Sequence, residues 1–236
     1  MKTTNKVLLA ALGLVIVAMV VVLIIIRGFV AGSVEVRELS AEEKELVEQE
    51  YDLAGFEGIR TKGVWEIDID RGQEYSVRVK SSRYLSDRLE VRTEGNELVL
   101  DLAERTSINL GSHTLRATVV MPELKRLDTA GGTSITLAGF VEEELAVAAR
   151  GASSLHVTDS SFQDVVLEIE GAGDIDMRDA ETQNAEVHVS GAGSVKLTMT
   201  GGRLTGSLEG AASVDYYGTV SEESVSTKGV SSVRAR

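Results

Sequence analysis

Gly171-Ala172-Gly173-Asp174-Ile175 decides the fold of this protein, because five further blocks of the sequence repeat its pattern. Each block opens with glycine, carries serine or aspartate at its fourth position and ends with an aliphatic residue. The opening glycines recur about every 20 residues, and such self-similarity at a fixed period is the signature of a repeat architecture. The other blocks are Gly131-Gly132-Thr133-Ser134-Ile135, Gly151-Ala152-Ser153-Ser154-Leu155, Gly191-Ala192-Gly193-Ser194-Val195, Gly210-Ala211-Ala212-Ser213-Val214 and Gly229-Val230-Ser231-Ser232-Val233.

Each block runs into an alternating segment. Ile175-Asp176-Met177 reads apolar, polar, apolar, which is the period of a strand with its middle side chain in solvent. A second alternating segment precedes each glycine, as Val165, Leu167 and Ile169 do before Gly171. The sequence therefore predicts two short strands per repeat. The predicted solvent-facing ladder is Thr136, His156, Asp176, Lys196, Asp215 and Arg234.

The two strands of a repeat do not form a hairpin, because no Asn-Gly or Asp-Gly turn separates them. A coil that stacks on the next coil at about 4.8 Å fits better. The predicted fold is all-β, a single-stranded parallel β-helix or solenoid with rungs of about 20 residues. Glycine suits the corners, since it adopts positive φ and lets backbones approach closely. The corner glycines are Gly131, Gly151, Gly171, Gly191, Gly210 and Gly229. The fourth-position residues, Ser134, Ser154, Asp174, Ser194, Ser213 and Ser232, form a ladder whose hydroxyls can hydrogen-bond between rungs.

The segment 51–127 also reads as strands, for example Trp65-Glu66-Ile67-Asp68-Ile69-Asp70. We expect it to be a less regular part of the same domain that covers the first clear rung. Trp65, the only tryptophan, is expected in the core or over the first rungs. The predicted β-solenoid domain is 51–236, with clear repeats in 127–236.

An unbroken apolar run, 7–26, precedes the domain. As a helix it would span about 30 Å, the thickness of a bilayer's hydrocarbon core. Lys2 and Lys6 stand before it without an acid, so the sequence predicts a transmembrane anchor at 7–26 with residues 1–6 in the cytoplasm and the rest outside it. The alternative is a cleaved signal peptide with its cleavage site at Ala31-Gly32-Ser33.

Residues 27–50 are predicted to be an acidic juxtamembrane linker. Ser40 and Glu43 fit a capping box, which predicts one or two helical turns over 40–50. The apolar content of this segment is too small to bury a face, so we interpret it as a solvated spacer.

The composition excludes several kinds of site. The chain has no cysteine, and hence no disulfide, thiolate metal site or thiol nucleophile. Its 23 glycines beside one proline indicate repeated tight turns, not disorder. The net charge of −13 repels nucleic acid, which is therefore not an expected partner.

No catalytic residue, metal ligand or cofactor site is predicted. The β-roll calcium motif recurs at a much shorter period with an aspartate in each copy, whereas here only Asp174 occupies its place in the repeat. His113, His156 and His188 show no ligand spacing. Rungs of near-constant length leave no loop to house catalytic groups, and an enzyme that uses Asp174 and Asp176 is the weakest alternative.

An exposed aromatic side chain is the usual mark of a glycan contact. Tyr216 and Tyr217 adjoin in an alternating strand, so one is expected to point inward and one outward. Tyr217 is the predicted outward residue and the one candidate contact residue.

Several motifs in order resemble a known family. Phe56-Glu57-Gly58-Ile59 opens the strand-rich segment, Met121-Pro122-Glu123-Leu124 leads into the first repeat, and Tyr216-Tyr217-Gly218 precedes the last. Together with the Gly-Ala-Gly blocks, they make residues 51–236 similar to the auto-transporter adhesin head GIN domain family. The resemblance implies an extracytoplasmic β-helical adhesin-like domain and no catalytic residues. Many members carry secretion or lipoprotein signals, where this chain has an apolar run typical of an anchor.

The sequence thus predicts a non-enzymatic, membrane-anchored cell-envelope protein that presents a β-helix for adhesion to an envelope protein or glycan. The alternative is a self-assembling structural protein that forms homo-oligomers, because an open solenoid end invites stacking. In that case Arg234 and Arg236 are the expected charges that block the end.

Overall fold

The computed structural model of the protein describes residues 45–103 and 115–236, all of which belong to one compact unit. The predicted anchor at 7–26, the predicted cytoplasmic segment 1–6 and His113 lie outside the described residues. Within them, no helix is both long and apolar enough to cross a membrane. The elements are β1 (Leu46–Tyr51), β2 (Gly58–Arg71), β3 (Ser76–Ser82), α3 (Arg83–Ser86), β4 (Leu89–Glu94), β5 (Glu97–Leu102), β6 (Leu115–Met121), β7 (Arg126–Ala138), β8 (Val141–Thr200), β9 (Arg203–Thr219), β10 (Glu222–Gly229) and β11 (Ser232–Ala235).

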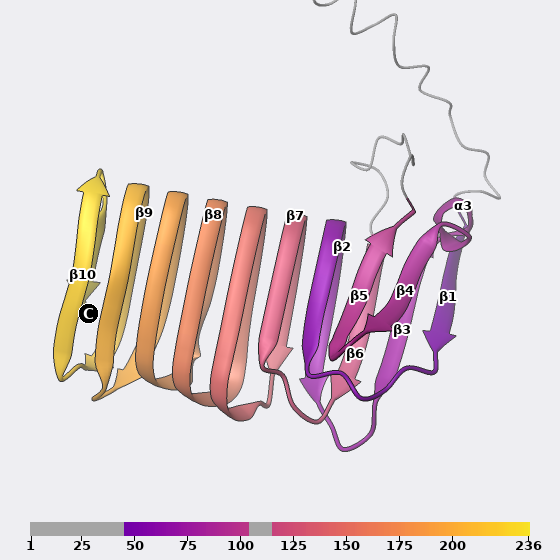
Figure 1. Cartoon of the computed structure of the whole chain (residues 1–236), viewed down its shortest axis with the longest axis horizontal. Helices are drawn as coiled ribbons and strands as arrows, with labels where there is room; N and C mark the ends of the chain where they lie inside the picture. The colour runs from indigo at the N-terminus through magenta and orange to yellow at the C-terminus, as the bar shows by residue number, and fades with distance from the viewer. Residues whose placement is uncertain (1–44, 104–114) are drawn as a thin grey trace, which may run out of the picture. The chain divides into compact units, whose positions relative to one another are not determined.

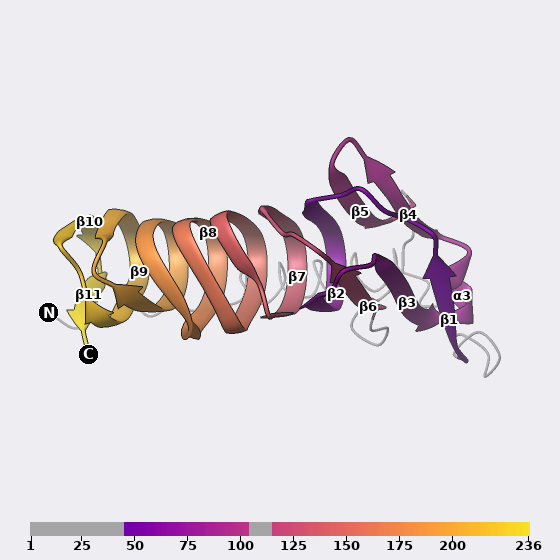
Figure 2. The same cartoon turned by 90° about the horizontal axis from the view of Figure 1, so that it is seen from below.

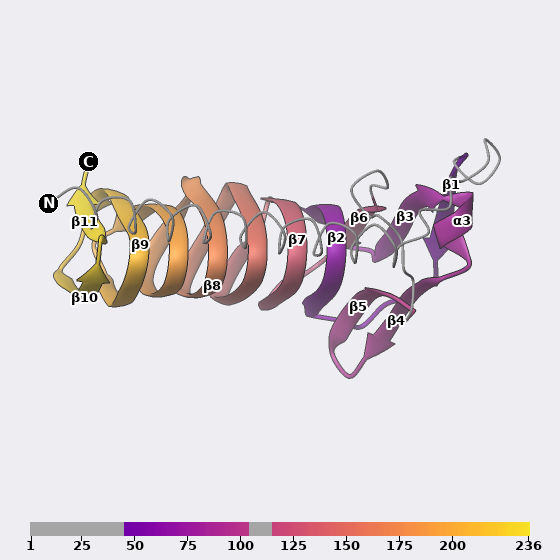
Figure 3. The ribbon, with the colours of Figure 1, turned by 90° about the horizontal axis from the view of Figure 1, so that it is seen from above.

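The repeats pair in parallel with one another, and the all-β expectation is confirmed. β7 pairs with β8 in the register of the repeat, so that Gly131 lies beside Gly151. β8 pairs with β9 in the same way, and Gly191 lies beside Gly210. β8 is a continuous strand of 60 residues that bends at its glycines and winds through successive circuits. We call each circuit, which has one corner glycine near its middle, a coil. Figures 2 and 3 show the ribbon winding in this way from β7 to β9.

The glycine corners follow from close backbone approach. The corner glycines have positive φ, +115° at Gly171 and +136° at Gly191. A β-carbon on Gly171 would lie 2.5 Å from the carbonyl oxygen of Gly151. No side chain fits in that space, so glycine is required at each of these bends.

β2 forms one coil more than the glycine spacing predicted. It pairs with β7 over Gly58 to Asp70, which places Gly63 beside Gly131 and Trp65 beside Thr133. Gly63 has a φ of +104° and takes the same corner. The two paired strands are far apart in the chain, because residues 72–125 lie between them in the sequence. The expectation that 51–127 only covers the first rung is therefore too simple, since part of it is itself a coil.

Beyond β2 the single sheet divides into two branches. The first half of β2 pairs with β5, and β5 pairs antiparallel with β4. The second half pairs with β6, which continues antiparallel through β3 to β1. Figure 1 shows the row of parallel strands that ends in these two branches, and in Figure 2 the β4–β5 pair leans away from β6, β3 and β1.

β1 corrects one expectation. The capping-box pattern of Ser40 and Glu43 predicted helical turns over 40–50, but Leu46–Tyr51 is a strand that pairs antiparallel with β3. The backbone N–H of Arg83 also donates to the carbonyl oxygen of Glu45. Residues 46–50 are thus part of the sheet and not a solvated spacer. Pairing with a strand that is distant in sequence outweighs a local helix signal.

The core fills the inside of the coils. Inward residues such as Leu167, Val187 and Val195 are almost fully buried, and they stack as columns of aliphatic side chains. Trp65 is 2% exposed and donates its indole N–H to the carbonyl oxygen of Lys62 at 2.8 Å. It lies in the core, as predicted. The outward residues between these columns form a lateral surface with no inserted loop between successive coils from β7 to β9.

Candidate functional site

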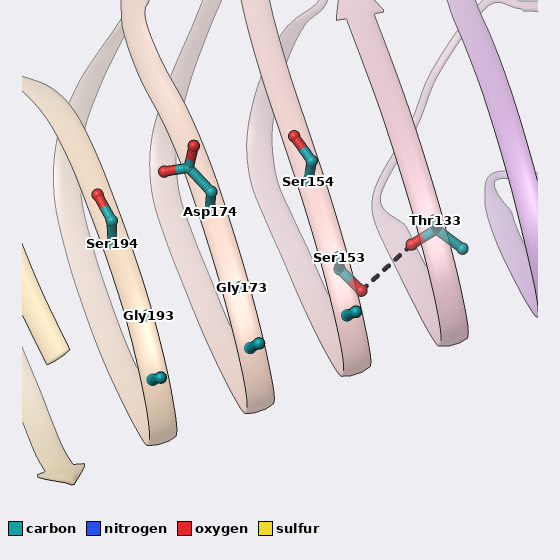
Figure 4. A pocket seen from close by; sticks show the side chains of 10 residues that line it. Thr133, Ser153, Ser154, Gly173, Asp174, Gly193 and Ser194 are labelled. Atoms are coloured by element: carbon teal, nitrogen blue, oxygen red, sulfur yellow. Dashed lines mark hydrogen bonds between the residues drawn. The ribbon is translucent and has the colours of Figure 1, made fainter. Parts of the chain in front are cut away.

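A shallow groove crosses the coils beside the glycine corner (Figure 4). Its volume is about 470 Å³. Every lining residue is small, and one is ionisable. The lining residues are Thr133, Ala152, Ser153, Ser154, Ala172, Gly173, Asp174, Ala192, Gly193 and Ser194.

Two glycines line the middle of the groove. Gly173 and Gly193 occupy the inward position that Thr133 and Ser153 fill on the coils before them, and in Figure 4 they present no side chain. A β-carbon on Gly173 would lie 2.6 Å from Cγ2 of Ile169. The core side chain of Ile169 therefore fills the space that a side chain at position 173 would need, and the strand presents only backbone to the groove at this point.

Hydroxyl groups line one end of the groove. The Thr133 hydroxyl donates a 3.2 Å hydrogen bond to Oγ of Ser153, drawn as a dashed line in Figure 4. Ser153 Oγ also lies 3.3 Å from Oγ1 of Thr129. This inward pair differs from the predicted hydroxyl ladder, because the fourth-position residues make no side-chain hydrogen bond. Those residues, which the structure describes in full, are Ser134, Ser154, Asp174, Ser194, Ser213 and Ser232. They face outward, where water satisfies them.

The charged side chains beside the groove form ion pairs with one another. The guanidinium of Arg178 donates to both carboxylate oxygens of Asp176, at 2.9 Å from Nε to Oδ1 and 2.7 Å from Nη2 to Oδ2. Nζ of Lys196 on the next coil lies 4.0 Å away. The Arg178 hydrogen bond lowers the pKa of Asp176 from 3.8 to about 2. Because this carboxylate is held by a guanidinium, Asp176 is poorly placed to act as a catalytic acid with Asp174.

The two tyrosines separate as the alternation predicted. Tyr216 is 8% exposed and packs in the core. Its hydroxyl donates a 2.8 Å hydrogen bond to Oε2 of Glu223, which raises the pKa of Tyr216. Tyr217 is half-buried on the outer face, where it interacts with Arg178. Tyr217 does not line the groove.

A second groove lies on the other side of the glycine corner, and the sequence reasoning did not find it. Its volume is about 310 Å³. His188 lies between Oγ of Ser207 and Oε1 of Glu186, each at 2.9 Å. Its lining residues are Glu168, Ile169, Glu170, His188, Val189, Ser190, Ser207 and Glu209. The signal that could have found it is the spacing of Glu168 and His188, which equals one full repeat and places them on adjacent coils.

No cluster that could bind a metal ion forms in the described part of the chain. Across residues 45–103 and 115–236, no three carboxylate or imidazole side chains gather in a way that could hold a metal ion. His156 is exposed on the outer ladder, apart from His188. The arrangement offers shallow surfaces of small and hydroxyl side chains, which suit binding by contact.

Comparison with known proteins places the chain in a family. The family model described as "Putative auto-transporter adhesin, head GIN domain" matches residues 55–220, which is well over half of the chain. The chain belongs to this family. The match takes in the β2 coil, the divided end and the coils from β7 to β9, so the GIN domain is nearly the whole of the described structure.

Solved structures share the fold of this GIN domain. A "putative adhesin" from Bacteroides fragilis is 16% identical, with a TM-score of 0.67 over 83% of this chain and 99% of that one. A "Putative lipid binding protein" from Parabacteroides distasonis is 15% identical, with a TM-score of 0.51 over 81% of this chain and 96% of that one. No curated protein matches the sequence. At these identities the likeness concerns the fold.

Proposed function

We propose that this GIN domain is a non-enzymatic contact module of the cell envelope, which binds a glycan or protein along the side of a single-stranded parallel β-helix. The parallel pairing of β7, β8 and β9, with corner glycine beside corner glycine, supports the β-helix. The family supports an adhesin-like role. We further propose that residues 7–26 anchor the chain in a membrane, with the domain outside the cytoplasm and without nucleic-acid partners.

The groove of Figure 4 is the observation that carries this proposal. It crosses several coils and presents hydroxyls, methyl groups and exposed backbone with one carboxylate, Asp174. Such a surface lets an extended ligand lie across the coils and make hydrogen bonds without a charged anchor. It lacks the paired acid and base that hydrolysis of a glycan needs. Tyr217 is a further contact for a ligand that extends past the groove.

A blocking substitution tests the proposal. The full-length protein, in detergent, is incubated with immobilised envelope glycans and envelope proteins, and bound protein is quantified. Ala172→Trp fills the groove from an exposed position and is expected to reduce binding at least tenfold. Gln183→Trp places the same side chain on an exposed site away from the groove and should bind as the wild type does.

Two outcomes contradict the proposal. The first is that the wild-type protein binds no envelope glycan or protein under native conditions. The second is that Ala172→Trp and Gln183→Trp bind equally well, which would move the contact away from the groove. Turnover of a polysaccharide that is lost in Asp174→Asn would instead support the enzyme alternative.

A further inference from the structure

One column of inward side chains changes from aliphatic to acidic at the C-terminal end of the stack. Ala185 pairs with Leu204, and Leu204 pairs with Glu223, so that these three side chains share one face of the sheet. Leu145 and Val165 occupy the same place on earlier coils. All four residues before Glu223 are at most 3% exposed. The last coil therefore points a carboxylate where every earlier coil from Leu145 onward points an aliphatic group.

The carboxylate of Glu223 is held in this inward position. The hydroxyl of Tyr216 donates to it at 2.8 Å. Tyr216 belongs to the coil below and reaches the carboxylate through the core, where its ring is buried. Among the described residues, Tyr216 is the only one whose side chain hydrogen-bonds Glu223. Glu223 is an exposed residue even though it faces the core side.

The strands of this last coil have unpaired edges. Within the described residues, β10 and β11 each pair with β9 alone. Figure 1 shows β10 as the last strand of the row. Val225 and Val233 pack against the core and are only partly covered. Unpaired edges with aliphatic residues are templates on which another chain can add a strand.

A second copy of this chain fits that edge by pairing β10 with β10 in antiparallel orientation. If Val225 faces Val225 of the second copy, Glu222 stands opposite Lys228 of the second copy on the outer face. Directly opposite residues of an antiparallel pair interact, and opposite charges there are favourable. The inward side chain of Glu223 would then be enclosed opposite Thr227 of the second copy. Enclosing a carboxylate without a cation is strongly unfavourable.

We propose that Glu223 keeps this protein from associating end to end, because its inward carboxylate blocks the C-terminal edge from pairing with a second copy of the chain. The edge is otherwise self-complementary. Glu223 thus takes the role that the sequence had assigned to Arg234 and Arg236. Arg236 instead pairs on the outer face with Asp215, at 3.2 Å.

The test compares two adjacent substitutions in the full-length protein in one detergent. Glu223→Leu restores the aliphatic column and should move the sedimenting species from the wild-type mass to twice that mass as concentration rises. Glu222→Leu makes the same chemical change one residue earlier on the outer face, and it should sediment as the wild type does. Equal behaviour of the two variants, whether both associate or neither does, overturns the proposal.

Two further variants keep the test decisive if Glu223→Leu fails to fold. Glu223→Gln keeps the shape and an acceptor for the Tyr216 hydroxyl but removes the charge, and it should also raise the dimer fraction.

The chain has no cysteine, so Val225→Cys reports the pairing as a disulfide-linked dimer on a non-reducing gel. That dimer should form in the Gln background and not with Glu223 intact. His156→Cys, exposed in mid-stack, should give none in either background. A Val225→Cys dimer that forms equally with Glu223 intact overturns the proposal.

Discussion

A β-carbon on Gly191 would lie 2.2 Å from the carbonyl oxygen of Gly171 on the preceding coil. The obstacle is backbone, and it cannot move without disturbing the sheet. The φ of Gly191, +136°, is also unfavourable for any residue with a β-carbon. Gly191→Ala should therefore lower the free energy of unfolding by more than about 3 kcal/mol or prevent folding. Urea denaturation followed by circular dichroism measures the loss.

Gly95→Ala is the matched control for Gly191→Ala. Gly95 has a φ of +59° but no atom within 4 Å of an added β-carbon. Gly95→Ala should lower the free energy of unfolding by only about 1–2 kcal/mol, which is the cost of left-handed backbone for a residue with a β-carbon. If the two alanine variants are equally stable, close approach between coils is not what requires glycine at the corner.

Tyr216→Phe should lower the free energy of unfolding by about 1–2 kcal/mol, because it removes a hydrogen bond to a carboxylate while keeping the buried ring. Thermal unfolding measures the change. Tyr217→Phe removes the hydroxyl of the adjacent, half-buried tyrosine and should cost less than about 0.5 kcal/mol. Equal losses would show that the Tyr216–Glu223 bond adds nothing to stability.

The ion pair of Asp176 with Arg178 predicts that the stability of the folded protein decreases at acidic pH. The folded-state pKa of Asp176 is about 2, below its usual 3.8. A lowered pKa stabilises the folded protein above the unfolded value, and this stabilisation is lost as pH falls from about 4 to 2. Asp176→Asn lacks this ion pair, so its free energy of unfolding should fall by about 1 kcal/mol less than that of the wild type over this pH range. This figure allows for screening by solvent around the half-exposed Arg178.

Unfolding free energies at pH 6, 4 and 2.5 check this prediction. Asp174→Asn is the matched control, because it makes the same change two residues earlier, at an outward carboxylate that has no ion pair among the described residues. If Asp176→Asn is as acid-sensitive as the wild type, the Arg178 pair does not contribute.

The aliphatic columns predict large losses from cavities. Leu167 is fully buried in the middle of β8. Leu167→Ala should lower the free energy of unfolding by about 2–5 kcal/mol, which urea denaturation detects. Leu46→Ala, at a residue 60% exposed, should change it by less than about 0.5 kcal/mol. A small effect at Leu167 would mean that the coils do not enclose a packed core.

Sequence reasoning reached the strands and their corners because the signals are local and recur. The spacing from Gly131 to Gly229 predicted which residues stand beside one another. Gly63 escaped notice because the long segment 72–125 separates its coil from the next in sequence, and because Trp65 and Glu66 depart from the small third residue and the serine or aspartate of the other blocks. Its signal was Ile67 and Ile69 at the same offsets from glycine as Ile175 and Met177 from Gly171.

The site was less accessible to sequence reasoning than the fold. The core side chains of Ile169 and Val189 require glycine at positions 173 and 193 of the groove, and a repeat pattern treats these glycines as ordinary small residues. Glu223 was missed for a similar reason, because its inward position becomes evident only beside the aliphatic column that it interrupts. The strand β1 was missed because its partner is distant in sequence and the helix signal was nearby.

The near-constant length of the coils has a consequence for how this protein tolerates insertions and deletions. Removing or duplicating one whole repeat, such as 171–190, would join equivalent backbone positions and change only the length of the stack, by about 4.8 Å. Inserting one residue within a strand would turn every following side chain to the opposite face. The gene should therefore accept changes of one full repeat far more readily than changes of one codon, and the reach of the domain can vary among relatives in steps of one coil.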